Sequence, residues 1–164
     1  MKLNVDGSRE HYNLNGPSAG CGGVLRNSSA KWVRGFAKKL DSSLGVHQTE
    51  LEAILTGLEF ASLMKIEKLV VESDNDSVVS MVKNGVNPGH PDFALIQQIK
   101  AKLQRFDWEV RLVAISNKAN SVADRLANNA RNLSFDDPYE EYFDPPVNCF
   151  QLLHNDEIGC ISSF

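Results

Sequence analysis

The sequence contains little cysteine and no long apolar segment. Its three cysteines (Cys21, Cys149 and Cys160) lie far apart in 164 residues, and none forms a C-x-x-C pair. This pattern argues against a disulfide framework and against a zinc site, and it is typical of a protein kept in a reducing compartment. No apolar run approaches the roughly 20 residues that cross a bilayer, so we expect no membrane-spanning segment.

The N-terminus also lacks the features of a secretion signal. The first six residues alternate apolar and polar side chains, and no apolar h-region with a small-residue cleavage site follows them. We therefore expect an intracellular protein, located in the nucleus or the cytoplasm.

Basic residues are absent from the last part of the chain. No Lys or Arg follows Arg131, whereas seven Asp and Glu fall there; residues 1–131 hold all 17 basic residues against 14 acids, a net charge of +3. A mildly basic body is compatible with phosphate binding, although strong nucleic-acid binders carry a denser basic patch. The change in charge predicts one domain over residues 1–133 and an acidic, partly ordered tail over residues 134–164.

The body of the chain alternates between strand and helix patterns. Three strand-like segments come first, at 2–6, 20–27 and 31–40, and predict an antiparallel meander. Apolar residues then recur at helical spacing over 46–64. The remaining elements are a strand (67–73), two helices (74–82 and 93–106), a strand (108–115) and a last helix (118–132). This order predicts an α/β domain whose sheet is covered by helices.

Two aspartates occupy the ends of predicted strands. Asp6 ends the first strand and precedes Gly7, and Asp74 ends the fourth strand and precedes a helix. Open α/β sheets place their binding sites outside the C-terminal ends of their strands. Turn formation by Asp6 and helix capping by Asp74 are alternative interpretations that the sequence leaves open.

Two further acids lie on predicted helices, each beside an apolar stripe. Helical spacing puts Glu50 on the side of Gly57, at the margin of the sheet-facing surface, where a carboxylate needs a cation. Gly57 would allow the helix to approach the sheet closely. Asp124 flanks the apolar stripe of the last helix, where pairing with Arg125 or Arg131 is the alternative interpretation.

Five blocks of sequence, in order, resemble the ribonuclease H family. They read Val5-Asp6-Gly7-Ser8, Gly22-Gly23-Val24-Leu25-Arg26-Asn27, Glu50-Leu51-Glu52-Ala53, Val71-Glu72-Ser73-Asp74 and Ala119-Asn120-Ser121-Val122-Ala123-Asp124-Arg125-Leu126-Ala127. The last block and the tail most resemble the ribonuclease H-like domains of plant proteins related to non-LTR retrotransposon reverse transcriptases. The resemblance implies a ribonuclease H-like fold, with a five-stranded mixed sheet whose first three strands are antiparallel and which is flanked by helices.

The resemblance also implies an activity and a cofactor. It implies a hydrolase: a metal-dependent endonuclease that cleaves the RNA strand of RNA–DNA hybrids. It assigns catalysis to Asp6, Glu50, Asp74 and Asp124, which would bind two Mg²⁺ ions, with Mn²⁺ as a substitute. In this assignment Asp6 bridges both ions. We expect a monomer that binds nucleic acid, either free-standing or as part of a larger polyprotein.

Two positions depart from the family pattern. Ala114 stands where many catalytic members carry a mobile His, and Val46-His47-Gln48 replaces an Asn pair that helps to read ribose 2′-hydroxyls. The alternative is therefore a ribonuclease H-fold module that binds nucleic acid or protein with little or no turnover.

Two unrelated activities are disfavoured. A haloacid dehalogenase-type phosphohydrolase would need Asp-x-Asp where the chain has Asp6-Gly7-Ser8. Gly20-Cys21-Gly22-Gly23 lies between two predicted strands and precedes no helix, so it does not match a dinucleotide-binding loop.

Overall fold

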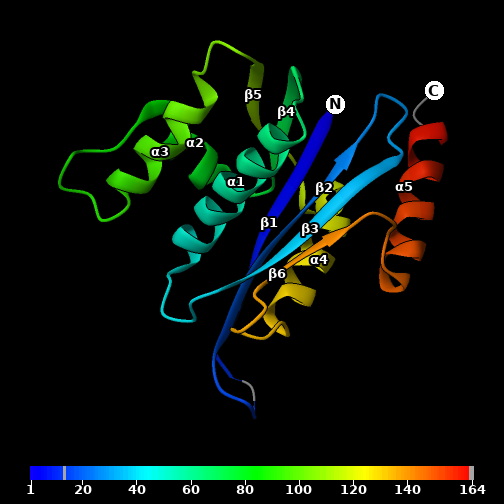
Figure 1. Cartoon of the computed structure of the whole chain (residues 1–164), viewed down its shortest axis with the longest axis horizontal. Coiled ribbons are helices and arrows are strands. Elements are labelled where there is room, and N and C mark those ends of the chain that lie inside the picture. The colour runs from blue at the N-terminus through cyan, green and yellow to red at the C-terminus, as the bar shows by residue number, and fades with distance from the viewer. Residues whose placement is uncertain (13, 163–164) are drawn as a thin grey trace.

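A six-stranded mixed sheet forms the centre of the molecule, in the order β5-β4-β1-β2-β3-β6 (Figure 1). The computed structural model describes residues 1–12 and 14–162, except for the side chains of residues 157–162. The first three strands form the predicted antiparallel meander, and the next two run parallel to β1. Their bounds are β1 (Lys2–Glu10), β2 (Ser18–Arg26), β3 (Trp32–Leu40), β4 (Lys68–Ser73) and β5 (Glu109–Ala114).

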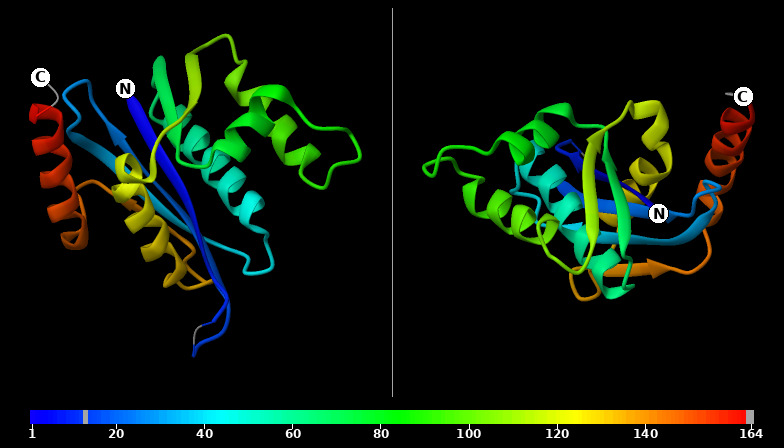
Figure 2. Two further views of the ribbon diagram at one scale, coloured as in Figure 1. Left: turned by 180° about the vertical axis from the view of Figure 1, so that it is seen from behind. Right: turned by 90° about the horizontal axis from the view of Figure 1, so that it is seen from above.

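Helices cover both faces of the sheet, as two views show (Figure 2). The helix α1 (Val46–Leu63) packs on one face, with α2 (Asp76–Asn84) and α3 (Phe93–Leu103) beside it. A short 3-10 helix, η1 (Asn117–Asn120), leads into α4 (Ser121–Arg131), which packs on β1, β2 and β3 from the other face. In the described part of the chain, no helix has the length and apolar character needed to cross a membrane.

The main core lies between the sheet and α1. Leu3 and Val5 of β1 are fully buried there. A Cβ atom at Gly57 would come within 2.7 Å of Val5 Cγ1, so this glycine permits the close approach of helix and sheet that the sequence predicted. Cys21 and Cys149 are buried free thiols, while the side chain of Cys160 lies outside the described residues.

The tail adds a sixth strand to the five that we predicted. Its first element, β6 (Tyr139–Tyr142), pairs antiparallel with β3, and Trp32 Nε1 donates to the Phe143 carbonyl at 3.1 Å. Two successive acids interrupt the strand pattern in the sequence. One of them, Glu141, is held by Arg34 of β3 at 2.7 Å, so cross-strand pairing compensates for its charge.

The tail continues into η2 (Val147–Cys149) and α5 (Phe150–Ser162), which pack outside α4 and the end of β2. They close a second apolar cluster that includes Val24, Val122, Leu126 and Cys149. Arg26 is 6% exposed, and its Nη1 atom lies 2.8 Å from Asp156 Oδ2 of α5. A buried cation of β2 is therefore balanced by the tail.

This ion pair predicts that the tail contributes to stability. Asp156→Ala leaves the buried Arg26 without its counter-charge, and we expect the free energy of unfolding to fall by about 3 kcal/mol. Urea unfolding followed by circular dichroism measures the change. Asp144→Ala removes an exposed acid of the same tail and serves as the control. Equal stability of the two variants would contradict the predicted role of Asp156.

Candidate metal centre

The first two acids of the site come together because β1 and β4 separate beside them. The parallel pairing of the two strands ends at Val5 and Ser73, and β1 continues to Glu10. The sequence predicted Asp6 at the end of the first strand, but Asp6 lies within β1. The sequence pattern predicts a shorter strand because the residues after Asp6 are polar and lack an apolar alternation. Asp74 follows the last residue of β4, next to the point where the strands part. The neighbouring Asp6 side chain is only 5% exposed.

Glu50 extends from α1, in the helical layer, to the point where β1 and β4 separate. It lies in the second turn of α1, is 8% exposed, and its Oε2 accepts a hydrogen bond from the Gly7 amide at 3.1 Å. The same amide donates to Asp6 Oδ1 at 2.9 Å. A Cβ atom at Gly7 would come within 2.8 Å of the Thr49 carbonyl carbon. Glycine at this position therefore allows α1 to deliver Glu50 to the strand.

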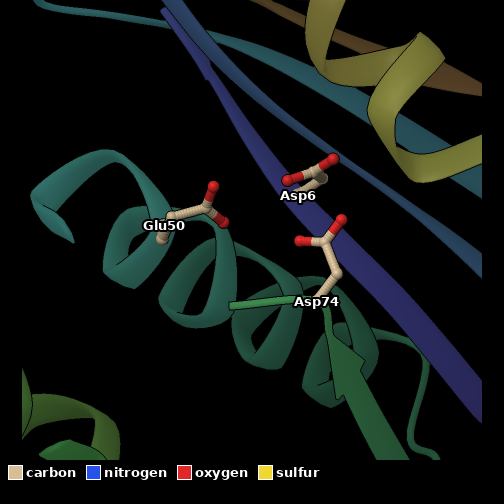
Figure 3. A group of neighbouring side chains, drawn as sticks. All are labelled: Asp6, Glu50 and Asp74. Carbon is tan, nitrogen blue, oxygen red and sulfur yellow. The ribbon is translucent and has the colours of Figure 1, made fainter. Parts of the chain in front are cut away.

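The three side chains form a compact group, the carboxylate triad of Asp6, Glu50 and Asp74 (Figure 3). One carboxylate oxygen of each lies within 4.8 Å of those of the other two. Burial, reinforced by the neighbouring acids, raises the pKa of both Asp6 and Glu50 well above the ordinary carboxyl range. Burial also raises the pKa of Asp74. The triad is thus an anionic site with a deficit of positive charge, and hard divalent cations suit such oxygen ligands.

The fourth predicted acid stands apart from this group. Asp124 lies in the first turn of α4 with an exposed side chain, and it does not join the triad within the same distance limit. Its negative charge nevertheless contributes to the raised pKa of Asp6, so the two side chains are neighbours. Asn128 Nδ2 donates to Asp124 Oδ2 at 3.4 Å. The structure therefore places Asp124 at the solvent-facing side of the triad.

One residue of the site was not singled out from the sequence. Asn120 is fully buried, and its Nδ2 donates to the Val5 carbonyl at 2.9 Å, directly before Asp6. The Asn120 side chain also hydrogen-bonds Asp74 and thereby opposes the rise in the pKa of that carboxyl. The sequence feature that could have indicated Asn120 as a residue of the site is its position one helical turn before Asp124. Asn120 connects β1, Asp74 and the start of α4.

Comparison with known proteins identifies the family. The family model described as "Reverse transcriptase-like" matches residues 4–130, which include all four predicted acids. The chain belongs to the reverse transcriptase-like family. A protein of Arabidopsis thaliana named "Putative ribonuclease H protein At1g65750" is 34% identical over 160 residues, covering 97% of the chain. The chain spans only 24% of the length of that relative.

Solved structures confirm that this reverse transcriptase-like chain has the ribonuclease H fold. RNase H1 of Halobacterium salinarum matches with a TM-score of 0.64 and 22% identity, covering 78% of this chain and 94% of the other. LC11-RNase H1, solved in complex with an RNA/DNA hybrid, matches with a TM-score of 0.63 and 22% identity. That match covers 80% of this chain and 96% of the other. Both the family resemblance and the predicted fold class are confirmed.

The raised pKa values predict how stability depends on pH when metal is removed by a chelator. A folded state that retains protons on Asp6 and Glu50 is destabilised as the pH rises above about 4, because the unfolded chain releases them there. Asp6→Asn removes one of these charges from the reverse transcriptase-like domain. We expect it to raise the free energy of unfolding at pH 8 by roughly 2 kcal/mol, with little effect near pH 4.

Denaturant unfolding at both pH values, with chelator, measures this difference. Asp76→Asn changes an exposed acid close to Asp74 and is the matched control. An Asp6→Asn variant less stable than wild type at pH 8 would contradict the prediction that repulsion among the carboxylates destabilises the folded state.

Proposed function

We propose that this domain is a divalent-metal-dependent nuclease that cleaves the RNA strand of RNA–DNA hybrids. The observation that carries the proposal is the carboxylate triad, three oxygens within 4.8 Å at the place where β1 and β4 separate in a ribonuclease H fold. The RNA/DNA hybrid bound by LC11-RNase H1, which has the same fold, supports the choice of substrate. Neither the family nor the fold alone specifies a reaction.

The residues present fit Mg²⁺, with Mn²⁺ as a substitute. All ligand atoms of the triad are carboxylate oxygens, the donors that a hard ion prefers, and no histidine belongs to the group among the described residues. Two ions bound here would activate a water molecule and stabilise the charge that develops on the scissile phosphate. Asp6, Glu50 and Asp74 would hold the metal, and the family resemblance adds Asp124 as a further ligand.

The chain prepares this site by fixing the carboxylates before a metal binds. The Gly7 amide donates to both Asp6 and Glu50, so a single backbone group sets their separation. Asn120 holds Asp74 and anchors β1 through the Val5 carbonyl. Asp124 is exposed and, among the residues that the structure describes, is held only by the longer 3.4 Å hydrogen bond from Asn128 Nδ2. Ligands held in advance bind with less loss of conformational entropy.

The proposed function predicts strong dependence on metal and on Asp6. We expect the wild-type domain to cleave a labelled RNA–DNA hybrid with Mg²⁺ and to lose activity in chelator. Asp6→Asn should reduce the rate by more than about 100-fold, since loss of a group that merely supports a metal ligand already costs 10–100-fold. Gel analysis of the labelled strands measures both effects.

Asp76→Asn again provides the control, because it alters an exposed charge near the site without touching the triad, and it should cleave at the wild-type rate. Binding of the hybrid without cleavage, at any metal concentration, would favour the alternative of a binding module. Equal cleavage by wild type and Asp6→Asn would contradict the assignment of the site.

A further inference from the structure

A cavity of about 660 Å³ opens on the same face of the sheet as the carboxylate triad. Its lining includes Asn4 of β1 and Glu72 of β4, which precede Asp6 and Asp74 by two residues. Residues two apart in a strand share a face and lie about 7 Å apart. The cavity therefore begins directly beside the triad and extends toward the N-terminal end of β1.

The cavity contains a buried cation with unused hydrogen-bond donors. Arg26 lines it, is 6% exposed, and pairs through Nη1 with Asp156, which also lines the cavity. The Nε and Nη2 atoms of Arg26 are buried and find no acceptor among the described residues. Buried donors without an acceptor cost free energy, and the guanidinium fork matches the oxygens of a phosphate. An anionic oxygen ligand would supply the missing acceptor.

Further positive potential comes from η1 and the start of α4. Lys118 and Ser121 line the cavity, and Lys118 forms no ion pair with any residue that the structure describes. The Asn120 side chain does not cap α4, because it bonds to β1 and to Asp74 instead. The first backbone amides of this helix consequently lack a side-chain cap, and such amides attract anions.

The two acids of the cavity are already paired. Glu72 Oε1 lies 2.9 Å from Lys2 Nζ, and Glu72 Oε2 accepts from Asn4 Nδ2 at 2.8 Å. Asp156 faces Arg26. Among the charged side chains of the cavity, Lys118 has no ion-pair partner and the Nε and Nη2 atoms of Arg26 have no acceptor in the described part of the chain. Asp156 Oδ2 lies 2.8 Å from Arg26 Nη1 but makes no well-aligned hydrogen bond with a described residue.

We propose that this cavity binds a phosphate group of the nucleic-acid strand that also occupies the carboxylate triad. The proposal rests on the proposed function for the identity of the strand. The sheet supplies Arg26, η1 supplies Lys118, α4 supplies its N-terminus, and the tail helix α5 closes the site from outside. The tail thus belongs to the substrate-binding surface and is not merely a structural appendage.

The first experiment uses inorganic phosphate as the probe, in chelator, and follows backbone amide resonances by NMR. Phosphate should shift the resonances of Lys118, Ala119 and Ser121 in a saturable manner. The double variant Arg26→Met with Asp156→Leu replaces the buried ion pair by apolar side chains of similar size, which preserves folding in other proteins. It should abolish the shifts. Absence of saturable shifts in the wild type would overturn the proposal.

The second experiment measures binding of an RNA–DNA hybrid in chelator, so that it does not depend on cleavage. Lys118→Ala should weaken binding about three- to tenfold at physiological salt and lower the salt dependence by about one charge. Lys83→Ala, an exposed lysine at the end of α2, is the control and should bind as wild type does. The double variant should weaken binding roughly tenfold, the effect of losing a charge-assisted hydrogen bond.

The control for the double variant is Arg34→Met with Glu141→Leu, which removes the ion pair between β3 and β6. It should bind the hybrid as wild type does. If phosphate shifts the wild-type resonances while the Arg26→Met/Asp156→Leu variant binds the hybrid as tightly as wild type does, the cavity is a site for small phosphate compounds. That result would contradict the assignment to the strand. Failure of the wild-type domain to cleave would contradict the nuclease function but not these binding results, because they are obtained without metal.

Discussion

Repulsion among three clustered carboxylates, two of them buried, is the constraint around which this domain is organised. Their oxygens come within 4.8 Å where Asp6 and Glu50 are almost excluded from water, so the charges are poorly screened. Within the protein itself, the Gly7 amide donates to both Asp6 and Glu50, and the raised pKa values of these two carboxyls favour their protonated forms. A divalent cation relieves the same repulsion more completely, and we regard this as the reason for the arrangement.

The surrounding architecture brings these charges together from distant parts of the chain. β4 stops pairing with β1 just before Asp6, which opens a gap between the strands. Glycine at position 7 lets α1 approach from one face and insert Glu50, while α4 approaches from the other with Asp124. Asn120 joins the two sides by bonding to β1 and to Asp74. The proposed phosphate cavity uses the same sheet face and adds the tail.

The sequence predicted the parts whose patterns are local. The strand meander, the amphipathic α1 and the βα unit on either side of Asp74 follow from periodicity, and the ordered family blocks indicated the four acids. Contacts between distant residues could not be predicted in this way. Arg26 and Asp156 form an ion pair although they are far apart in the chain. The acids of β6 do not resemble a strand pattern, and this segment pairs as a strand with β3. Asn120 resembled an ordinary residue at a helix start until its partners were known.

Whether the carboxylate triad holds divalent metal can be determined from a crystal structure of the domain soaked with Mn²⁺. Anomalous scattering locates manganese independently of any assay. The account predicts at least one strong anomalous peak coordinated by Asp6 together with Glu50 or Asp74, and loss of that peak in Asp6→Asn crystals. Manganese bound only elsewhere on the protein, or a triad without metal at saturating Mn²⁺, would contradict it.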